Sequence, residues 1–171
     1  MKRFNYLVLL TCVSAVLSIY SCKNNPKQDA TREEQVAEFR ADLTAADTSA
    51  MLTICDEAME QLKQKNIENV LGSLYEYSDS TKELKPLSDK LRRRYTKMFT
   101  MFPVLEYKRV YYSFMLEGCN DVKYEVTFAT AEQTGTDQPA TTMYMFNPVK
   151  VDGEWKLCVK GAEDEFDTDF Q

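Results

Sequence analysis

The chain of 171 residues contains no histidine, and this absence removes several kinds of active site. Without an imidazole the chain cannot form a Ser-His-Asp or Cys-His nucleophilic site, nor a zinc site with histidine ligands. Its few glycines form no phosphate-binding loop. We therefore expect no catalytic residue, no metal site and no cofactor.

Glycine, proline and cysteine are scarce, with five residues of each. So little glycine and proline, beside many aromatic residues, indicates that most of the chain folds as one domain with one core. Outside the first 22 residues the cysteines are Cys55, Cys119 and Cys158. We expect Cys55 in a helix core, Cys119 in a turn and Cys158 on an outer strand face, and therefore no disulfide.

Basic residues are in deficit, with 21 Lys and Arg against 27 Asp and Glu and a formal net charge of −6. An acidic chain without a basic stripe is a poor candidate for nucleic-acid binding. Five of the acids fall in residues 161–171, which contain no Lys or Arg. We predict that this stretch forms an acidic tail outside the folded domain.

The first 21 residues have the composition of an export signal. A basic start and a mostly apolar run to Ile19 precede the dipeptide Ser21-Cys22. We predict that residues 1–21 are removed, that Cys22 is lipidated, and that residues 22–30 form a flexible polar tether. The alternative is an ordinary secretory cut that leaves Cys22 unmodified.

Apolar residues at helical spacing predict two helices in the first part of the domain. A short amphipathic helix falls within residues 31–46, and its Thr31-Arg32-Glu33-Glu34 start has the form of a capping box. A stronger helix covers about Ser49 to Lys65, with Asp47 or Thr48 as its N-cap.

Two further helices follow before the pattern changes. The third begins after Asn66, and a polar loop from Ser78 to Lys85 separates it from the fourth. Pro86 suits the start of the fourth helix, and Pro103 ends it.

From Val104 onward the apolar residues recur at strand spacing. The cleanest alternation, at residues 122–128, is the best strand signal in the chain. Asp152-Gly153 marks a tight hairpin turn, and Trp155 should face inward beyond it. The four expected strands cover Val104–Leu116, Val122–Phe128, Thr141–Val151 and Glu154–Lys160.

Helices followed by antiparallel strands indicate the α+β class, with N-terminal helices packed on a curved four-stranded antiparallel meander sheet. The closing hairpin Val149-Lys150-Val151-Asp152-Gly153-Glu154-Trp155-Lys156-Leu157 resembles those of the NTF2-like (cystatin-related) superfamily. It is most similar to the small domains of unknown function found on bacterial lipoproteins. The resemblance covers residues 47–160 and implies a cone-shaped sheet whose open end is often left unfilled.

Aromatic residues of the sheet and of the facing helices are the candidate ligand contacts. Tyrosine offers both a contact face and a hydroxyl, and one cation in the first strand could orient an acidic head group. The alternative is that these rings simply form the core. The five candidates are Tyr75, Tyr95, Arg109, Tyr124 and Tyr144.

Two other charged features have open interpretations. Isomerases of the superfamily use an Asp base beside a Tyr and a neutral Asp, but we expect the strand acids of this chain on solvated faces. We expect the run Arg92-Arg93-Arg94 to lie on a solvent-exposed face of the fourth helix. It could instead meet an acidic partner or residues 161–171.

These features together predict a lipoprotein of the cell envelope, most simply at the outer membrane. Its domain would be non-catalytic and would bind a small apolar ligand or an envelope protein. The alternatives are an isomerase- or lyase-type enzyme in an NTF2-like cone, and a structural accessory of an envelope complex. A buried acid beside two tyrosines in a deep pocket would favour the enzyme; a closed core with exposed apolar groups would favour partner binding.

Overall fold

The computed structural model describes residues 31–78, 81–116 and 118–160. Arg32–Gln171 forms a compact unit of its own. The predicted signal at residues 1–21, the tether at 22–30, the lipidated Cys22 and the tail at 161–171 lie outside the described residues. Within the described part, none of the helices has the length and apolar character needed to span a membrane.

The first two helices confirm the predicted pair, with one corrected boundary. Helix α1 covers Arg32–Asp42, and α2 covers Ala45–Lys63. The N-cap of α2 is Thr44, not Asp47 or Thr48. The Thr44 hydroxyl accepts a hydrogen bond from the Asp47 amide at 3.2 Å, and the Asp47 carboxylate accepts one from the Thr44 amide at 3.0 Å. This capping box satisfies donors that the first turn would otherwise leave unpaired.

The next two helices, both shorter than α2, frame a hairpin that the sequence did not predict. Helix α3 covers Ile67–Ser73 after Asn66, whose side chain makes no capping hydrogen bond. Helix α4 covers Asp89–Met101 and is capped by Ser88, not begun by Pro86. A one-turn helix, α5, covers Ala131–Thr134 in the loop of the long β4–β5 hairpin.

The strands form a three-stranded sheet of order β3-β4-β5, a second of order β2-β1-β8, and the hairpin β6-β7. Among the strands that the structure describes, β1 and β8 are the pair that runs parallel. The strand bounds are β1 Tyr75–Ser78, β2 Glu83–Pro86, β3 Glu106–Ser113, β4 Asp121–Ala129, β5 Ala140–Phe146, β6 Val149–Val151, β7 Glu154–Lys156 and β8 Cys158–Lys160.

The α+β class is confirmed, but the meander has three strands rather than four. The third predicted strand divides into β5 and β6 around Asn147-Pro148. The fourth divides after Lys156: β7 pairs with β6, whereas β8 pairs with β1. The division also changes the phase of the side chains, so Cys158 is fully buried and the prediction of an outward thiol is wrong.

Strands β1 and β2 were predicted as the end of a helix and a polar loop. The β1 segment pairs with β2 on one side and with β8 on the other, and Tyr75 lies opposite both Pro86 and Cys158. Neither strand has a long alternating pattern of its own, because each is only four residues long. Strand β1 is held by β8, about eighty residues later in the sequence, and β2 pairs in turn with β1.

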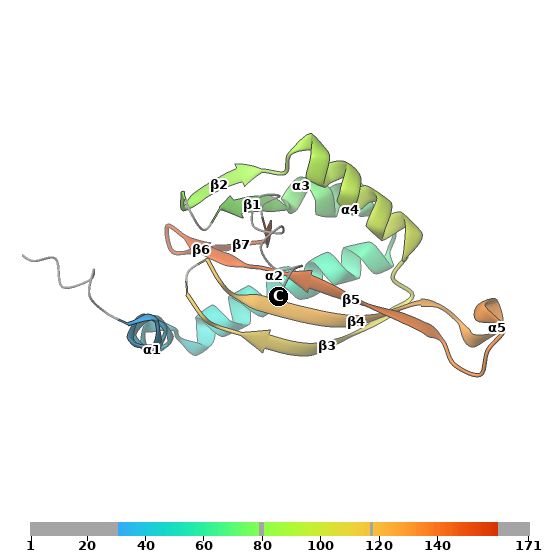
Figure 1. The fold of residues 1–171 in the computed structure, drawn as a ribbon, viewed down its shortest axis with the longest axis horizontal. Helices are drawn as coiled ribbons and strands as arrows, with labels where there is room; N and C mark the ends of the chain where they lie inside the picture. Colours follow the sequence, from blue (N-terminus) through green and yellow to red (C-terminus); the bar gives the residue numbers. More distant parts are fainter. Residues whose placement is uncertain (1–30, 79–80, 117, 161–171) are drawn as a thin grey trace, which may run out of the picture. The chain divides into compact units, whose positions relative to one another are not determined.

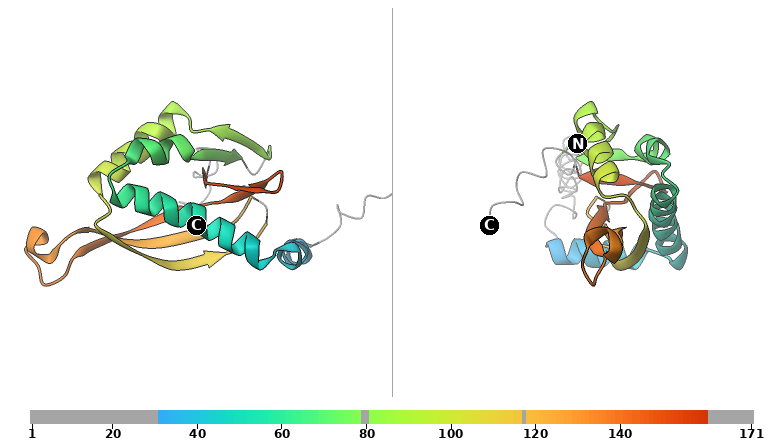
Figure 2. Two further views of the ribbon diagram at one scale, coloured as in Figure 1. Left: turned by 180° about the vertical axis from the view of Figure 1, so that it is seen from behind. Right: turned by 90° about the vertical axis from the view of Figure 1, so that its right-hand side faces the viewer.

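Helix α2 runs along one face of the β3-β4-β5 sheet (Figures 1 and 2). The spacing predicted a stripe of Leu52, Cys55, Met59 and Leu62, of which the last three are buried; Met51 is buried where Leu52 was expected. Trp155 is 9% exposed, which confirms its predicted inward position. The strands β4 and β5 continue past the body as a long hairpin with α5 near its tip (Figure 1).

Candidate functional site

Two of the predicted ligand contacts, Arg109 and Tyr124, come together on α2. The Tyr124 hydroxyl donates to Asp56 Oδ1 at 2.6 Å, and Arg109 Nη1 lies 2.6 Å from Asp56 Oδ2. Tyr124 and Arg109 are register partners on β4 and β3, so both side chains reach the same turn of α2. We call Asp56, Arg109 and Tyr124 the seam cluster.

The seam cluster continues along the line where α2 meets β3. The Tyr107 hydroxyl is 3.5 Å from Glu60 Oε2, and Lys63 Nζ is 3.0 Å from Glu106 Oε2. Asp56, Glu60 and Lys63 follow one another at helical spacing, which is why one edge of α2 supplies the whole row. The sequence gave no signal that singled out Asp56.

The electrostatics of the seam cluster suit a structural link better than acid-base chemistry. Burial raises the pKa of Tyr124 well above its ordinary value, and the hydrogen bond to Asp56 raises it further. The phenol therefore stays protonated and serves as a donor. The side chains of Arg109 and Asp56 are 33% and 43% exposed, so water screens their charges.

The other three predicted contacts lie elsewhere. Tyr144 is 2% exposed, donates to the Phe102 carbonyl at 2.6 Å and packs on Phe99 with ring centroids 5.4 Å apart. Tyr95 also packs on Phe99, with ring centroids 5.8 Å apart. Burial raises the pKa values of Tyr95 and Tyr144 to about 12. Tyr75 is on β1, in a separate small cluster with Val149.

The five predicted contacts therefore do not line one cavity, and rings occupy the space between α2 and the sheet. Tyr124 also packs on Phe146, with ring centroids 6.2 Å apart, and both are buried. A ligand between the helices and the sheet would have to displace these side chains. The role of these residues in ligand binding stays a prediction that the geometry does not favour.

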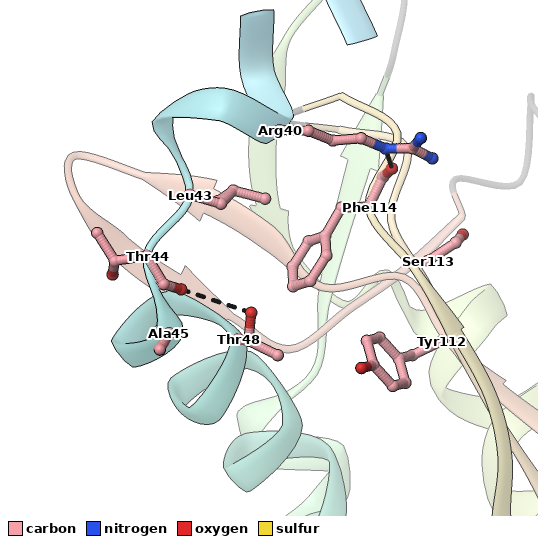
Figure 3. A pocket seen from close by; sticks show the side chains of 8 residues that line it. All are labelled: Arg40, Leu43, Thr44, Ala45, Thr48, Tyr112, Ser113 and Phe114. Atoms are coloured by element: carbon pink, nitrogen blue, oxygen red, sulfur yellow. Dashed lines mark hydrogen bonds between the residues drawn. The ribbon is translucent and has the colours of Figure 1, made fainter. Parts of the chain in front are cut away.

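An open pocket lies instead where α1 turns into α2, against the C-terminal end of β3 (Figure 3). Its volume is about 400 Å³, within the usual range of roughly 300–1,000 Å³ for small binding sites. We call it the end pocket. It is lined by Arg40, Leu43, Thr44, Ala45, Thr48, Tyr112, Ser113 and Phe114.

Aromatic side chains dominate one wall of the end pocket. The Phe114 ring lies between Leu43 and Tyr112 in Figure 3. Tyr112 is 48% exposed, and its ring meets Phe114 edge-on at a centroid distance of 6.2 Å. Behind the pocket, Phe114 packs on Trp155 at 5.9 Å. The pocket is therefore an apolar surface with a rigid aromatic base.

Arg40 supplies the charge at the rim of the end pocket. Its Nε donates to the Phe114 carbonyl at 2.6 Å, which fixes the guanidinium beside the pocket (Figure 3). The sequence proposed Arg109 as the orienting cation, but Arg109 pairs with Asp56. No sequence signal pointed to Arg40, because its position depends on a carbonyl 74 residues later in the chain.

Metal binding has no candidate in the part of the chain that the structure describes. No group of three or more His, Cys, Asp or Glu side chains there could hold an ion. Among the described residues, Cys55, Cys119 and Cys158 form no disulfide.

Comparison with known proteins gives a likeness of fold only. No protein-family model and no curated protein matches this chain. A protein of unknown function with a cystatin-like fold from Nostoc punctiforme is 14% identical over 69% of this chain and 92% of its own, with a TM-score of 0.43. A protein from Campylobacter jejuni, provisionally described as an NTF2-like transpeptidase, is 11% identical over 63% of this chain and 96% of its own, with a TM-score of 0.39.

A third structure, from Xanthomonas campestris, is provisionally described as a calcium/calmodulin-dependent protein kinase II association domain. It is 14% identical over 70% of this chain and 86% of its own, with a TM-score of 0.40. At these scores and identities the likenesses carry no argument about what this chain does.

Proposed function

We propose that this chain is a non-catalytic binding domain of the cell envelope, held at a membrane by lipid on Cys22, and that an envelope protein docks at the end pocket. The proposal includes the NTF2-like cone. Its support is the resemblance of the closing hairpin and the order of elements, in which α1 to α4, interrupted by β1 and β2, precede the antiparallel sheet β3-β4-β5.

The observation that carries the proposal is the aromatic wall of the end pocket. A tyrosine that is 48% exposed beside a half-buried phenylalanine offers apolar area at the surface of a domain whose core is already closed. Aromatic and arginine side chains are enriched among the anchors of protein interfaces. Tyr112, Phe114 and Arg40 supply all of these within one hollow.

The filled interior favours a protein partner over a small apolar ligand. A small ligand gains most from a site that encloses it, and Tyr124, Tyr144 and Phe146 occupy the enclosed space. The end pocket is open on one side, where a partner could insert one apolar side chain and keep its own backbone outside.

The seam cluster is the observation that would favour an enzyme instead, because it sets an acid beside a buried tyrosine. However, Asp56 is partly exposed and forms an ion pair with Arg109. It also accepts a hydrogen bond from the Tyr124 hydroxyl. A general base must lie within reach of a substrate proton, whereas Asp56 already holds Arg109 through one oxygen and Tyr124 through the other. A binding role agrees better with this geometry.

The test compares two neighbouring tyrosines that are equally exposed. Tyr112 lines the end pocket, whereas Tyr111 lies on the opposite face of β3 over Lys123; each is 48% exposed. A photocrosslinking residue would be placed at either position in the full chain and activated in intact cells. We expect a discrete protein adduct from position 112 and at least a fivefold weaker one from position 111.

Native mass spectrometry of the same protein, exposed to envelope extract, separates the remaining outcomes. A retained small molecule that is lost on Tyr112→Ala but kept on Tyr111→Ala would replace the protein partner with a small ligand at the same pocket. Equal adducts from positions 111 and 112, with no retained molecule, would contradict a role for the end pocket.

A further inference from the structure

One face of α4 is basic and has an exposed apolar end. Arg93, Lys97 and Met101 follow one another at intervals of four residues and therefore lie on one side of the helix. Met101 is 56% exposed, the most exposed large hydrophobic side chain in the described residues. We call this surface the outer face of α4; it has a hollow of about 490 Å³ lined by Arg92, Arg93, Thr96, Lys97, Thr100 and Met101.

Two cations on this face are available to a binding partner. Arg92 is engaged with α3, since its Nη1 lies 3.1 Å from Glu68 Oε2. Arg93 and Lys97 are exposed, and neither forms an ion pair with any residue that the structure describes. The outer face therefore combines positive charge with an uncovered methionine.

We infer that residues 161–171 of the same chain dock on the outer face of α4. The segment has five acids and no Lys or Arg, and it is the strongest concentration of negative charge in the sequence. It also contains Phe166 and Phe170, whose rings match the apolar end at Met101. The segment and the outer face of α4 are thus complementary both in charge and in apolar groups.

The path of the chain brings the 161–171 segment near α4. Residue 161 follows β8, which pairs along β1, and Lys160 lies opposite Tyr77. The β1 residue Glu76 accepts a hydrogen bond from the Ser88 amide at the start of α4. Eleven extended residues reach roughly 36 Å, whereas the thirteen residues of α4 span about 20 Å. The segment is long enough to lie along the helix.

The docking is expected to be sensitive to salt. Exposed ion pairs are individually weak, so several must act together with the burial of the phenylalanine rings. The Debye length falls from about 10 Å at 0.1 M salt to about 3 Å at 1 M. High salt should therefore release the segment while leaving the folded domain unchanged.

A spin label at the end of the segment tests the inference. The protein would comprise residues 22–171 with Cys22→Ser, since Arg32–Gln171 forms a compact unit. Gln171→Cys carries the label, and Cys119→Ser removes the one partly exposed thiol; Cys55 and Cys158 are fully buried. We expect NMR signals of the Arg92–Met101 amides to lose at least half their intensity at low salt and to recover at 1 M salt.

Matched variants check that charge is responsible. Arg93→Gln with Lys97→Gln should restore the α4 signals, whereas Lys108→Gln, which removes an exposed cation on β3, should leave the broadening unchanged. Broadening spread evenly over the domain, or centred away from α4, would overturn the inference. Broadening of an unlabelled, isotope-enriched chain by a labelled chain mixed with it would show instead that the segment binds a second copy.

Discussion

At the scale of single residues, the hydroxyls of buried tyrosines decide what these side chains do. A buried phenol needs a hydrogen-bond partner. Tyr124 finds one on α2, at Asp56, and Tyr144 finds one at the end of α4, at the Phe102 carbonyl. Each tyrosine therefore fastens a helix to the sheet. The buried tyrosines that suggested a ligand site in the sequence therefore link helices to the sheet.

Trp155 differs from these tyrosines because its indole N–H is buried without a hydrogen-bond partner among the described residues. An unsatisfied buried donor costs roughly 1–3 kcal/mol. The ring nevertheless packs on Phe114 and fills the core behind the end pocket. Its apolar surface, and not its polar atom, must account for its contribution to stability.

This difference gives a prediction for two substitutions. Trp155→Ala should lower the free energy of unfolding by about 3–5 kcal/mol, because it leaves a large cavity. Trp155→Phe should cost less than about 1.5 kcal/mol, because it keeps an aromatic ring and removes the unpaired donor. Urea unfolding followed by circular dichroism measures both. Equal losses for the two variants would contradict the view that the apolar surface of the ring accounts for the contribution of Trp155 to stability.

At the scale of elements, the start of α2 depends on charge as well as on its capping box. Lys150 Nζ, in β6, lies 2.6 Å from Asp47 Oδ1. This contact joins the first turn of α2 to the β6-β7 hairpin. The hydrogen bond from Lys150, and then those from Thr44, hold the pKa of Asp47 well below its ordinary value. One carboxylate thus caps a helix and anchors a hairpin.

A pH dependence follows from that lowered pKa. A carboxyl whose pKa is lower in the folded state stabilises the fold above its unfolded pKa, about 3.9, and loses this effect as pH falls through the folded value. Asp47→Asn should therefore lower the melting temperature at pH 6, and the difference from the unaltered protein should shrink between about pH 4 and pH 2. Asp137→Asn, on the exposed hairpin loop, is the control. A difference that does not change with pH would contradict this account.

At the scale of the whole molecule, its interior is closed and its candidate binding surfaces lie on the outside. The core of α2, α4 and the β3-β4-β5 sheet is filled by side chains that include Tyr124, Tyr144 and Phe146. The end pocket and the outer face of α4 involve different elements. One could therefore serve a partner while the other is covered.

Attachment to a membrane is the prediction that belongs to this scale, and it rests on Cys22. Two or more acyl chains anchor a protein stably, since each buried CH₂ contributes about 0.8 kcal/mol. We expect the unaltered protein to sediment with membranes, and Cys22→Ala to be soluble or to retain its signal. Fractionation with immunoblotting measures the partition. Equal partition of both proteins into the membrane fraction would exclude lipid on Cys22.

The sequence by itself determined the features that depend on neighbouring residues. The stripe of α2, the clean alternation of β4 and the inward position of Trp155 could all be predicted, because helix and strand periods are local. The α+β class followed from the change of period near Pro103. Cys55 was placed in the core for the same reason, and it is fully buried.

Only the tertiary structure decided the features that need a partner far along the chain. The strands β1 and β8 exist because they pair with each other, and that pairing buries Cys158. Asp56 receives Arg109 and Tyr124 from strands more than fifty residues later. The end pocket brings Arg40 together with the Phe114 carbonyl, 74 residues later in the chain. No local period encodes such contacts, since they arise only when the packing of α2 on the sheet sets the two segments side by side.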